Sequence, residues 1–247
     1  MTGGVVAVVA HPDDESLIAG GTLALAAQAG AATGVVSLTR GEEGPIAEEM
    51  TVASGKLGEV RESELERAGR ELGVTWTACL RHPDGELPWV DHEAAADELF
   101  ALLAPHEPSV VLTFGPDGLY WHPDHVAARE IAVLAAGRLD GHVHVYEAAW
   151  PRGLMASLVA AAADRGLPVG LWGLEPDAFG SDRTPTVVID VRPALARKLA
   201  ALRAHRSQIG ADHLFAALPA DVAERFLGFE PWAGAGGGAL AELIRGG

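Results

Sequence analysis

Two clusters of histidine and acidic residues stand out, because each lies just beyond a short apolar run. The sequence HPDDE at residues 11–15 follows the run at 5–9, and HPDH at 122–125 comes soon after the run at 109–114. The three consecutive carboxylates of the first cluster repel one another. A bound divalent cation would offset that repulsion.

The residue types and spacing fit catalytic zinc, which takes three protein ligands and keeps one position open for water. His11 and Asp14 are three residues apart, and either His122 or His125 supplies the third ligand; spacing alone does not choose between them. The remaining groups suit metal-assisted hydrolysis. A carboxylate can deprotonate water, a histidine can protonate the leaving group, and Tyr120 can donate to a developing oxyanion.

The elements that position these clusters alternate between strand and helix. Apolar runs rich in β-branched residues predict buried strands, at 5–9, 33–38, 75–80, 109–114, 143–149 and 186–190. Helical periodicity predicts helices at about 15–29, 59–72, 92–103, 126–139 and 193–206. This order is typical of an α/β fold with a Rossmann-like, mostly parallel sheet flanked by helices. Residues 45–57 receive no assignment, and 150–184 read as irregular.

The length of 247 residues permits one α/β domain over 1–247. We expect a core at about 5–150 and a C-terminal strand–helix elaboration at about 151–247. In a sheet of order 3-2-1-4, the loops that carry His11 and His125 would meet in one crevice.

Composition excludes several classes of protein. The net charge of −16 argues against nucleic acid and against an anionic membrane surface. The chain shows no targeting segment and no apolar stretch long enough to span a bilayer. With a single cysteine, Cys79, it can form no intrachain disulfide, which favours a reducing compartment. We therefore expect a cytoplasmic protein with a small-molecule substrate. The sequence is compatible with a homo-oligomer.

The two clusters also resemble the signature motifs of a known family. AHPDDE at 10–15 and HPDH at 122–125 look like those of the LmbE/PIG-L family, zinc-dependent N-deacetylases of N-acetylglucosamine conjugates and related amides. TRGEEG at 39–44 resembles the family's loop after the second strand, and Arg61 and HRSQ at 205–208 are weaker matches. The resemblance extends from residue 5 to about 210.

This resemblance implies a metal site and a base. His11, Asp14 and His125 would bind one zinc ion per chain, or another divalent ion in its place. Asp13 would be the general base. The substrate would be an N-acetylated amino-sugar conjugate.

The resemblance also implies four further roles. His122 would stabilise the tetrahedral intermediate or act as general acid, with Asp124 orienting it. Tyr120 would lie near the oxyanion, and Arg61 would bind substrate. Trp121 departs from the family, which often has glycine there, and its ring is expected to narrow the pocket.

Other functions compete with deacetylation of an amino sugar. The chain could be a metal-dependent amidase of a thiol conjugate or antibiotic intermediate, or a two-metal phosphoesterase, although one complete ligand set is apparent. A dinucleotide-binding protein needs glycines where this chain has three acids after its first strand. A non-catalytic binding module would have no need of the intact acids and histidines.

Overall fold

The computed structural model describes residues 3–141, 143–235 and 238–245. Within these residues the chain forms a seven-stranded sheet of order β3-β2-β1-β4-β5-β7-β6. The strands are β1 (Gly4–Val9), β2 (Thr33–Ser37), β3 (Trp76–Cys79), β4 (Pro108–Thr113), β5 (His144–Ala148), β6 (Val187–Asp190) and β7 (Phe229–Ala233). Strands β1 to β5 run parallel, and β7 is antiparallel to both its neighbours. The predicted mostly parallel sheet is confirmed, and the 3-2-1-4 order is present.

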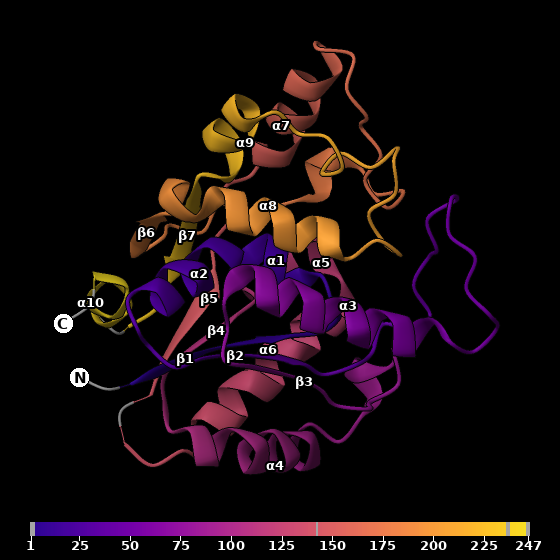
Figure 1. Ribbon diagram of the computed structural model, residues 1–247. Helices are drawn as coiled ribbons and strands as arrows, with labels where there is room; N and C mark the ends of the chain where they lie inside the picture. Colours follow the sequence, from indigo (N-terminus) through magenta and orange to yellow (C-terminus); the bar gives the residue numbers. More distant parts are fainter. Residues whose placement is uncertain (1–2, 142, 236–237, 246–247) are drawn as a thin grey trace.

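The sheet lies between two layers of helices (Figure 1). Helices α4 and α6 cover one face, whereas α1, α2 and α3 cover the other. Helix α8 packs on these three helices, with α7 and α9 beyond it. The described helices are α1 (Asp14–Ile18), α2 (Gly20–Gln28), α3 (Leu57–Leu72), α4 (His92–Leu103), α5 (Gly118–Trp121), α6 (Pro123–Ala136), α7 (Leu154–Ala163), α8 (Leu195–Ala204), α9 (Ala220–Leu227) and α10 (Ala239–Arg245). In the part of the chain that is described, none of them is long and apolar enough to cross a membrane.

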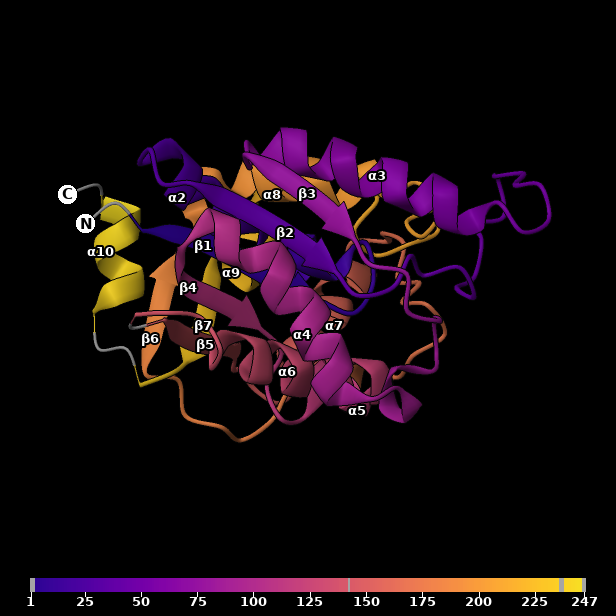
Figure 2. The ribbon, with the colours of Figure 1, turned by 90° about the horizontal axis from the view of Figure 1, so that it is seen from below.

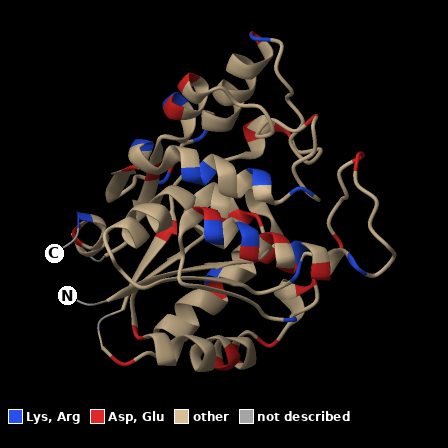
Figure 3. Ribbon diagram, viewed as in Figure 1, with Lys and Arg blue, Asp and Glu red and all other residues tan. Residues whose placement is uncertain are grey.

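The central strands form because their residues are apolar on both faces. All six residues of β1 are buried, and Val5 pairs with Thr33 on one side and with Val110 on the other. Figure 3 shows few charges on the strands, whereas α3 carries both signs along its length. A strand covered by helices on both sides must be apolar throughout, and this is the pattern that the sequence shows.

The helix predicted at 15–29 is divided into two. Ala19 has non-helical backbone angles (φ −128°, ψ −4°), so α1 ends before it and α2 begins after it. The carboxylate of Glu230 on β7 accepts hydrogen bonds from the backbone N–H groups of Gly21 and Thr22, at 2.8 Å each. Lys198 pairs with the same carboxylate at 2.6 Å. The free N–H groups at the start of α2 are thus satisfied from the other end of the chain.

The C-terminal part differs most from the prediction. The expected strand at 186–190 is β6 and the expected helix at 193–206 is α8, but α7, α9 and β7 were not predicted as elements. Strand β7 contains Pro231, a residue that argues against a strand when read from sequence alone. It inserts between β5 and β6, so the C-terminal elaboration continues the same sheet.

Candidate metal centre and active site

The carboxyl ends of β1 and β4 meet where the strand order reverses. The chain turns from β1 into α1 through the first cluster, and from β4 into α5 and α6 through the second. The arrowheads of β2, β3 and β4 point towards this side of the molecule (Figure 2). A cavity of about 310 Å³ opens here, a size at the lower end of small-molecule sites, which span about 300–1,000 Å³. Its lining is His11, Asp13, Asp14, Leu17, Glu43, Gly44, Pro45, Arg61, Asp84, Gly85, Tyr120, His122, Trp172, Leu174 and Gln208.

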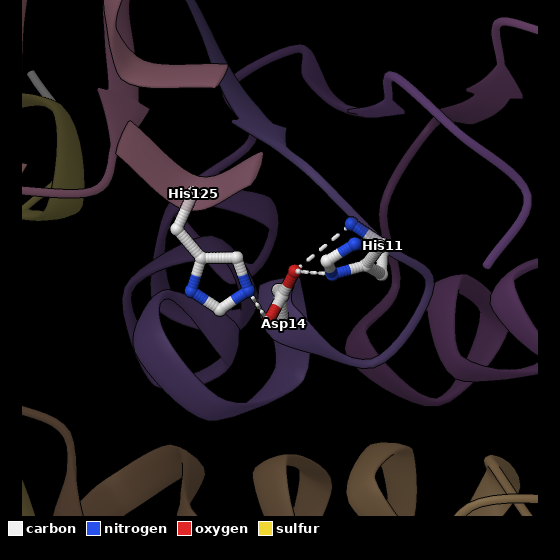
Figure 4. Close-up of side chains that lie close together, drawn as sticks. All are labelled: His11, Asp14 and His125. Atoms are coloured by element: carbon white, nitrogen blue, oxygen red, sulfur yellow. Dashed lines mark hydrogen bonds and ion pairs between the residues drawn. The ribbon is translucent and has the colours of Figure 1, made fainter. Parts of the chain in front are cut away.

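The three residues predicted to bind metal lie together beside this cavity (Figure 4). One nitrogen or oxygen atom from each of His11, Asp14 and His125 lies within 4.8 Å of those of the other two. Asp14 Oδ2 is 3.3 Å from His11 Nδ1, and Asp14 Oδ1 is 3.3 Å from His125 Nε2. All three side chains are buried. Two imidazole nitrogens and one carboxylate form a donor set of the kind that holds catalytic zinc.

The hydrogen bonds of His125 fix which ring nitrogen faces Asp14. Its Nδ1 lies 3.0 Å from the carbonyl of Gly118 and donates to it, which leaves a lone pair on Nε2. Among the described residues, this buried Nε2 has no hydrogen-bond partner. Burial lowers the pKa of His125 to about 3, so the ring is neutral. A neutral imidazole held by a backbone carbonyl and turned towards a carboxylate fits a metal ion.

His11 is oriented by two carboxylates. Its Nε2 lies 3.0 Å from Asp84 Oδ1 and 3.2 Å from Asp124 Oδ2, so this nitrogen donates and Nδ1 turns to Asp14. Asp124 also accepts the backbone N–H groups of Gly85 and Leu87. Partners of this kind set the ring orientation of metal-binding histidines.

The predicted contact between the Asp124 carboxylate and His122 is therefore absent from the structure. The carboxylate contacts His11, and only the backbone N–H of Asp124 reaches His122, donating to Nδ1 at 3.2 Å. This contact makes His122 the N-cap of α6 and leaves its proton on Nε2. Burial lowers the pKa of His122, so its ring is a neutral N–H donor lining the cavity.

Asp13 lies in the cavity wall with an unusual backbone. Its φ is +128°, a value that residues other than glycine rarely adopt, and its N–H donates to Glu15 Oε2 at 2.9 Å. Burial raises the pKa of the Asp13 carboxyl to about 7, although Arg61 opposes that shift. Strained backbone of this kind is concentrated at functional sites.

Arg61 lies in the cavity wall, as a substrate-binding residue would, but its guanidinium is already engaged. Nη1 donates to the carbonyl of Gly41 at 2.9 Å, and Nη2 donates to that of Pro12 at 2.8 Å. Nη2 also lies 3.3 Å from Asp13 Oδ2. Arg61 therefore ties two loops together and holds the carboxylate of Asp13.

Tyr120 and His122 are presented by a tight, strained turn. Leu119 and Trp121 both have positive φ, of 68° and 62°. The ring of Tyr120 meets those of His122 and His125 edge-on, with centroids 5.7 and 5.0 Å apart. Burial raises the pKa of the Tyr120 phenol well above its usual range, so the hydroxyl stays protonated and can donate a hydrogen bond.

The expectation that Trp121 narrows the pocket is wrong. Its side chain is 70% exposed, and it does not belong to the described lining of the cavity. The left-handed backbone at this position turns the ring outwards. The bulk at the cavity comes instead from Trp172, in the segment 150–184 that was predicted to be irregular.

Sequence reasoning missed three further groups at the site. Asp84 follows β3 at the same edge of the sheet, and this position after a strand could have indicated that it belongs to the site. Glu15 is buried and pairs with His205 at 2.8 Å. Gln208, in the weak motif at 205–208, lines the cavity, and its amide donates to the carbonyl of Pro45.

The comparisons with known proteins agree on one family. The family model described as "PIG-L: GlcNAc-PI de-N-acetylase" matches residues 6–136. A deacetylase of 1D-myo-inositol 2-acetamido-2-deoxy-α-D-glucopyranoside from Acidothermus cellulolyticus is 34% identical, over 93% of this chain and 88% of its own. With a match over more than half its length, the chain belongs to the PIG-L family, the class that the two motifs indicated.

Solved structures share the fold. A conserved protein from Thermus thermophilus superposes with a TM-score of 0.62 at 25% identity, covering 93% of both chains. The 4-carboxy-2-hydroxymuconate hydratase of Pseudomonas putida has a TM-score of 0.66 at 20% identity, covering 95% of this chain and 96% of its own. Because one of these structures is that of a hydratase, the fold alone does not define the reaction.

Proposed function

We propose that this chain is a metal-dependent N-deacetylase that hydrolyses the acetamide of an N-acetylglucosamine conjugate. The observation that carries the proposal is the buried donor set of His11, Asp14 and His125 next to the carboxylate of Asp13 on one cavity. Membership of a family described as de-N-acetylases supports it. The name of the Acidothermus cellulolyticus relative supports an inositol glycoside as the class of substrate.

The three ligands would hold one zinc ion. When bound, the ion would supply Lewis-acid chemistry, polarising the amide carbonyl and making water easier to deprotonate. The ligand geometry favours a single ion. A second candidate group, His11, His122 and Asp124, shares His11 with the first. Its Asp124 already accepts two backbone N–H groups.

The proposed base is Asp13. Its carboxylate takes a proton from the water that attacks the amide carbon, and Arg61 holds it in place for this step. Asp13 and Asp14 are neighbours with different tasks, because successive side chains on a turning loop point in different directions.

The proposed donors are His122 and Tyr120. The phenol of Tyr120 donates to the oxygen that gains negative charge in the tetrahedral intermediate. The neutral His122 donates a hydrogen bond from Nε2–H to the tetrahedral intermediate. The proton that Asp13 took from water passes to the amide nitrogen as the C–N bond breaks, so that acetate and a free amine leave. In this assignment Asp124 and Asp84 are positioning residues for His11.

The competing phosphoesterase function has little support. The cavity lining contains the carboxylates of Asp13, Asp14, Glu43 and Asp84. Its arginine, Arg61, is already bound to Asp13 and to two carbonyls. A phosphate dianion would meet acidic side chains, with no free cation in the described lining to receive it.

Metal removal tests the proposal directly. Treatment with a chelator should abolish release of amine from an N-acetylglucosamine conjugate, followed with fluorescamine, and added zinc should restore it. Phosphate release from a generic phosphomonoester, measured beside it, should stay at background. Deacetylation that survives complete removal of metal would refute the assignment.

Arg61→Lys separates two roles of this arginine. A lysine has one cationic nitrogen and cannot reach both carbonyls and Asp13 together. We expect kcat to fall by up to about 10²-fold, because the base is misplaced, while KM changes little. Arg67→Lys on the same helix is the matched control. A higher KM with unchanged kcat would instead assign Arg61 to substrate binding, as the sequence suggested.

A further inference from the structure

The turn after α8 carries two polar side chains that point into the protein. Helix α8 packs on α1, which begins in the first cluster, and on α3, which carries Arg61 (Figure 1). At the end of α8, His205 and Ser207 are fully buried, whereas Arg206 between them is exposed. Neither buried residue belongs to the described lining of the cavity, so neither is placed to touch a substrate there. Their polar groups are instead bound inside the protein.

Two buried glutamates accept these groups. His205 Nε2 donates to Glu15 Oε1 at 2.8 Å. Ser207 donates twice to Glu64, from its backbone N–H at 2.9 Å and from its hydroxyl at 2.6 Å. Both glutamates are fully buried, and a buried carboxylate is costly unless hydrogen bonds satisfy it. The turn after α8 therefore helps to hold both carboxylates in place.

Glu15 connects His205 to the proposed base. Its second oxygen, Oε2, accepts the backbone N–H of Asp13 at 2.9 Å. That backbone has a φ of +128°, and a rare conformation of this kind persists only where the surrounding contacts enforce it. The carboxylate of Glu15 therefore joins His205 to the backbone that directs the Asp13 side chain.

Glu64 connects Ser207 to the other support of the base. Glu64 lies three residues after Arg61 on α3, so both side chains lie on the same side of the helix. Arg61 Nη2 is 3.3 Å from Asp13 Oδ2. The contact of Ser207 with Glu64 fixes this turn of α3 against the C-terminal segment. The same contact therefore fixes the position of the Arg61 guanidinium.

We propose that His205 and Ser207 are positioning residues for the general base, Asp13. His205 acts on its backbone through Glu15. Ser207 acts through Glu64 on the arginine that holds its carboxylate. The positioning role rests on the proposed function, in which Asp13 takes a proton from water. A shift of about 1 Å in a reacting group can cost about 10²-fold in rate, so residues that never meet the substrate can control turnover.

Removing the donor of His205 should lower kcat without changing KM or metal content. His205→Leu keeps a side chain of similar size and leaves Glu15 without this bond. With N-acetylglucosaminyl-inositol as substrate, we expect kcat to fall by about 10²-fold, because Asp13 is misplaced. His205→Gln, whose amide can donate in the place of Nε2, should restore most of the rate. Ser207→Ala keeps its backbone N–H and should lower kcat by about tenfold.

Two control variants separate positioning from stability. Lys198→Met, also on α8, removes a fully buried donor from another buried carboxylate, that of Glu230, which binds the start of α2. This variant should lower Tm and leave kcat unchanged at temperatures where the protein stays folded. Arg206→Gln, exposed between the two positioning residues, should change neither quantity.

A double-variant cycle tests whether His205 acts through Asp13. In a chain that already carries Asp13→Asn the base is gone, so His205→Leu should cause no further fall in kcat. Rates are measured with enzyme in excess over substrate, so that slow turnover stays detectable. His205→Asn, whose shorter amide falls short of Glu15, replaces the leucine variant if that variant does not fold.

The outcomes distinguish the positioning role from the function. If the unmodified protein released no amine from N-acetylglucosaminyl-inositol, the proposed function would be wrong, and the positioning role with it. If it released amine but His205→Leu kept its kcat, lost its metal, or lowered kcat by the same factor beside Asp13→Asn, only the positioning role would be wrong. An unchanged kcat in Ser207→Ala would overturn the connection through Glu64.

Discussion

Replacing His125 with alanine should remove bound metal and deacetylation together. His125 is fully buried, and its Nε2 lies 3.3 Å from Asp14 with Nδ1 anchored on the carbonyl of Gly118. Its loss leaves His11 and Asp14 as a two-ligand site, below the three ligands that catalytic zinc needs. Metal content by atomic spectroscopy should fall from about one ion per chain to background.

His122→Ala should give the opposite pattern. His122 caps α6 through Nδ1 and presents Nε2 to the cavity, outside the proposed ligand set. The variant should keep its metal and lose turnover by about 10²–10³-fold, the usual cost of removing one hydrogen-bond donor to the tetrahedral intermediate. His106→Ala, at an exposed position, should change neither property. If the two active-site variants exchanged these phenotypes, the assignment of the histidines would be reversed.

Asp13→Asn should keep metal and fold but lose most turnover. Asparagine has nearly the shape of aspartate and is enriched at positive φ, so the unusual backbone at this position is retained. Its amide cannot accept a proton from water. We expect a fall of about 10²–10⁴-fold in kcat on an N-acetylated glycoside.

The pH profile gives a second measurement on the same residue. A base works only when ionised, so kcat/KM of the unmodified protein should rise with pH up to the pKa of Asp13, which is about 7 without the cation and lower beside it. This limb should be absent in Asp13→Asn. Asp91→Asn, at an exposed helix N-cap where asparagine serves equally well, is the control. A near-normal rate, or loss of metal, would show that Asp13 is not the base.

Strands β1 to β4 and their order could be predicted from sequence because the central strands are apolar on both faces. The same pattern placed the loops after Val9 and Thr113 beside each other, since strands that flank a reversal of order are neighbours. The pattern could not show contacts between residues that are far apart in the sequence. The start of α2 is bound by Glu230, and the strand that carries Glu230 was hidden by Pro231.

The candidate site was predictable to a similar depth. The types and spacing of its residues indicated His11, Asp14 and one of two histidines, and the family resemblance indicated His125 as that histidine. The structure brings His11, Asp14 and His125 together. Contacts beyond them were not predictable, because they depend on side-chain direction. Asp124 contacts His11 where His122 was expected, and Trp121 points outwards because its backbone is left-handed.

The carboxylate of Glu230 has a consequence for how the molecule assembles. It satisfies the start of α2 from a position 209 residues later in the chain, so these N–H groups gain their protein partner only after the C-terminal strands have been synthesised. The N-terminal segment that carries His11 and Asp14 is synthesised early, but its contacts are completed late. We therefore expect the active site to form as a late event of folding, in one cooperative step with the C-terminal strands.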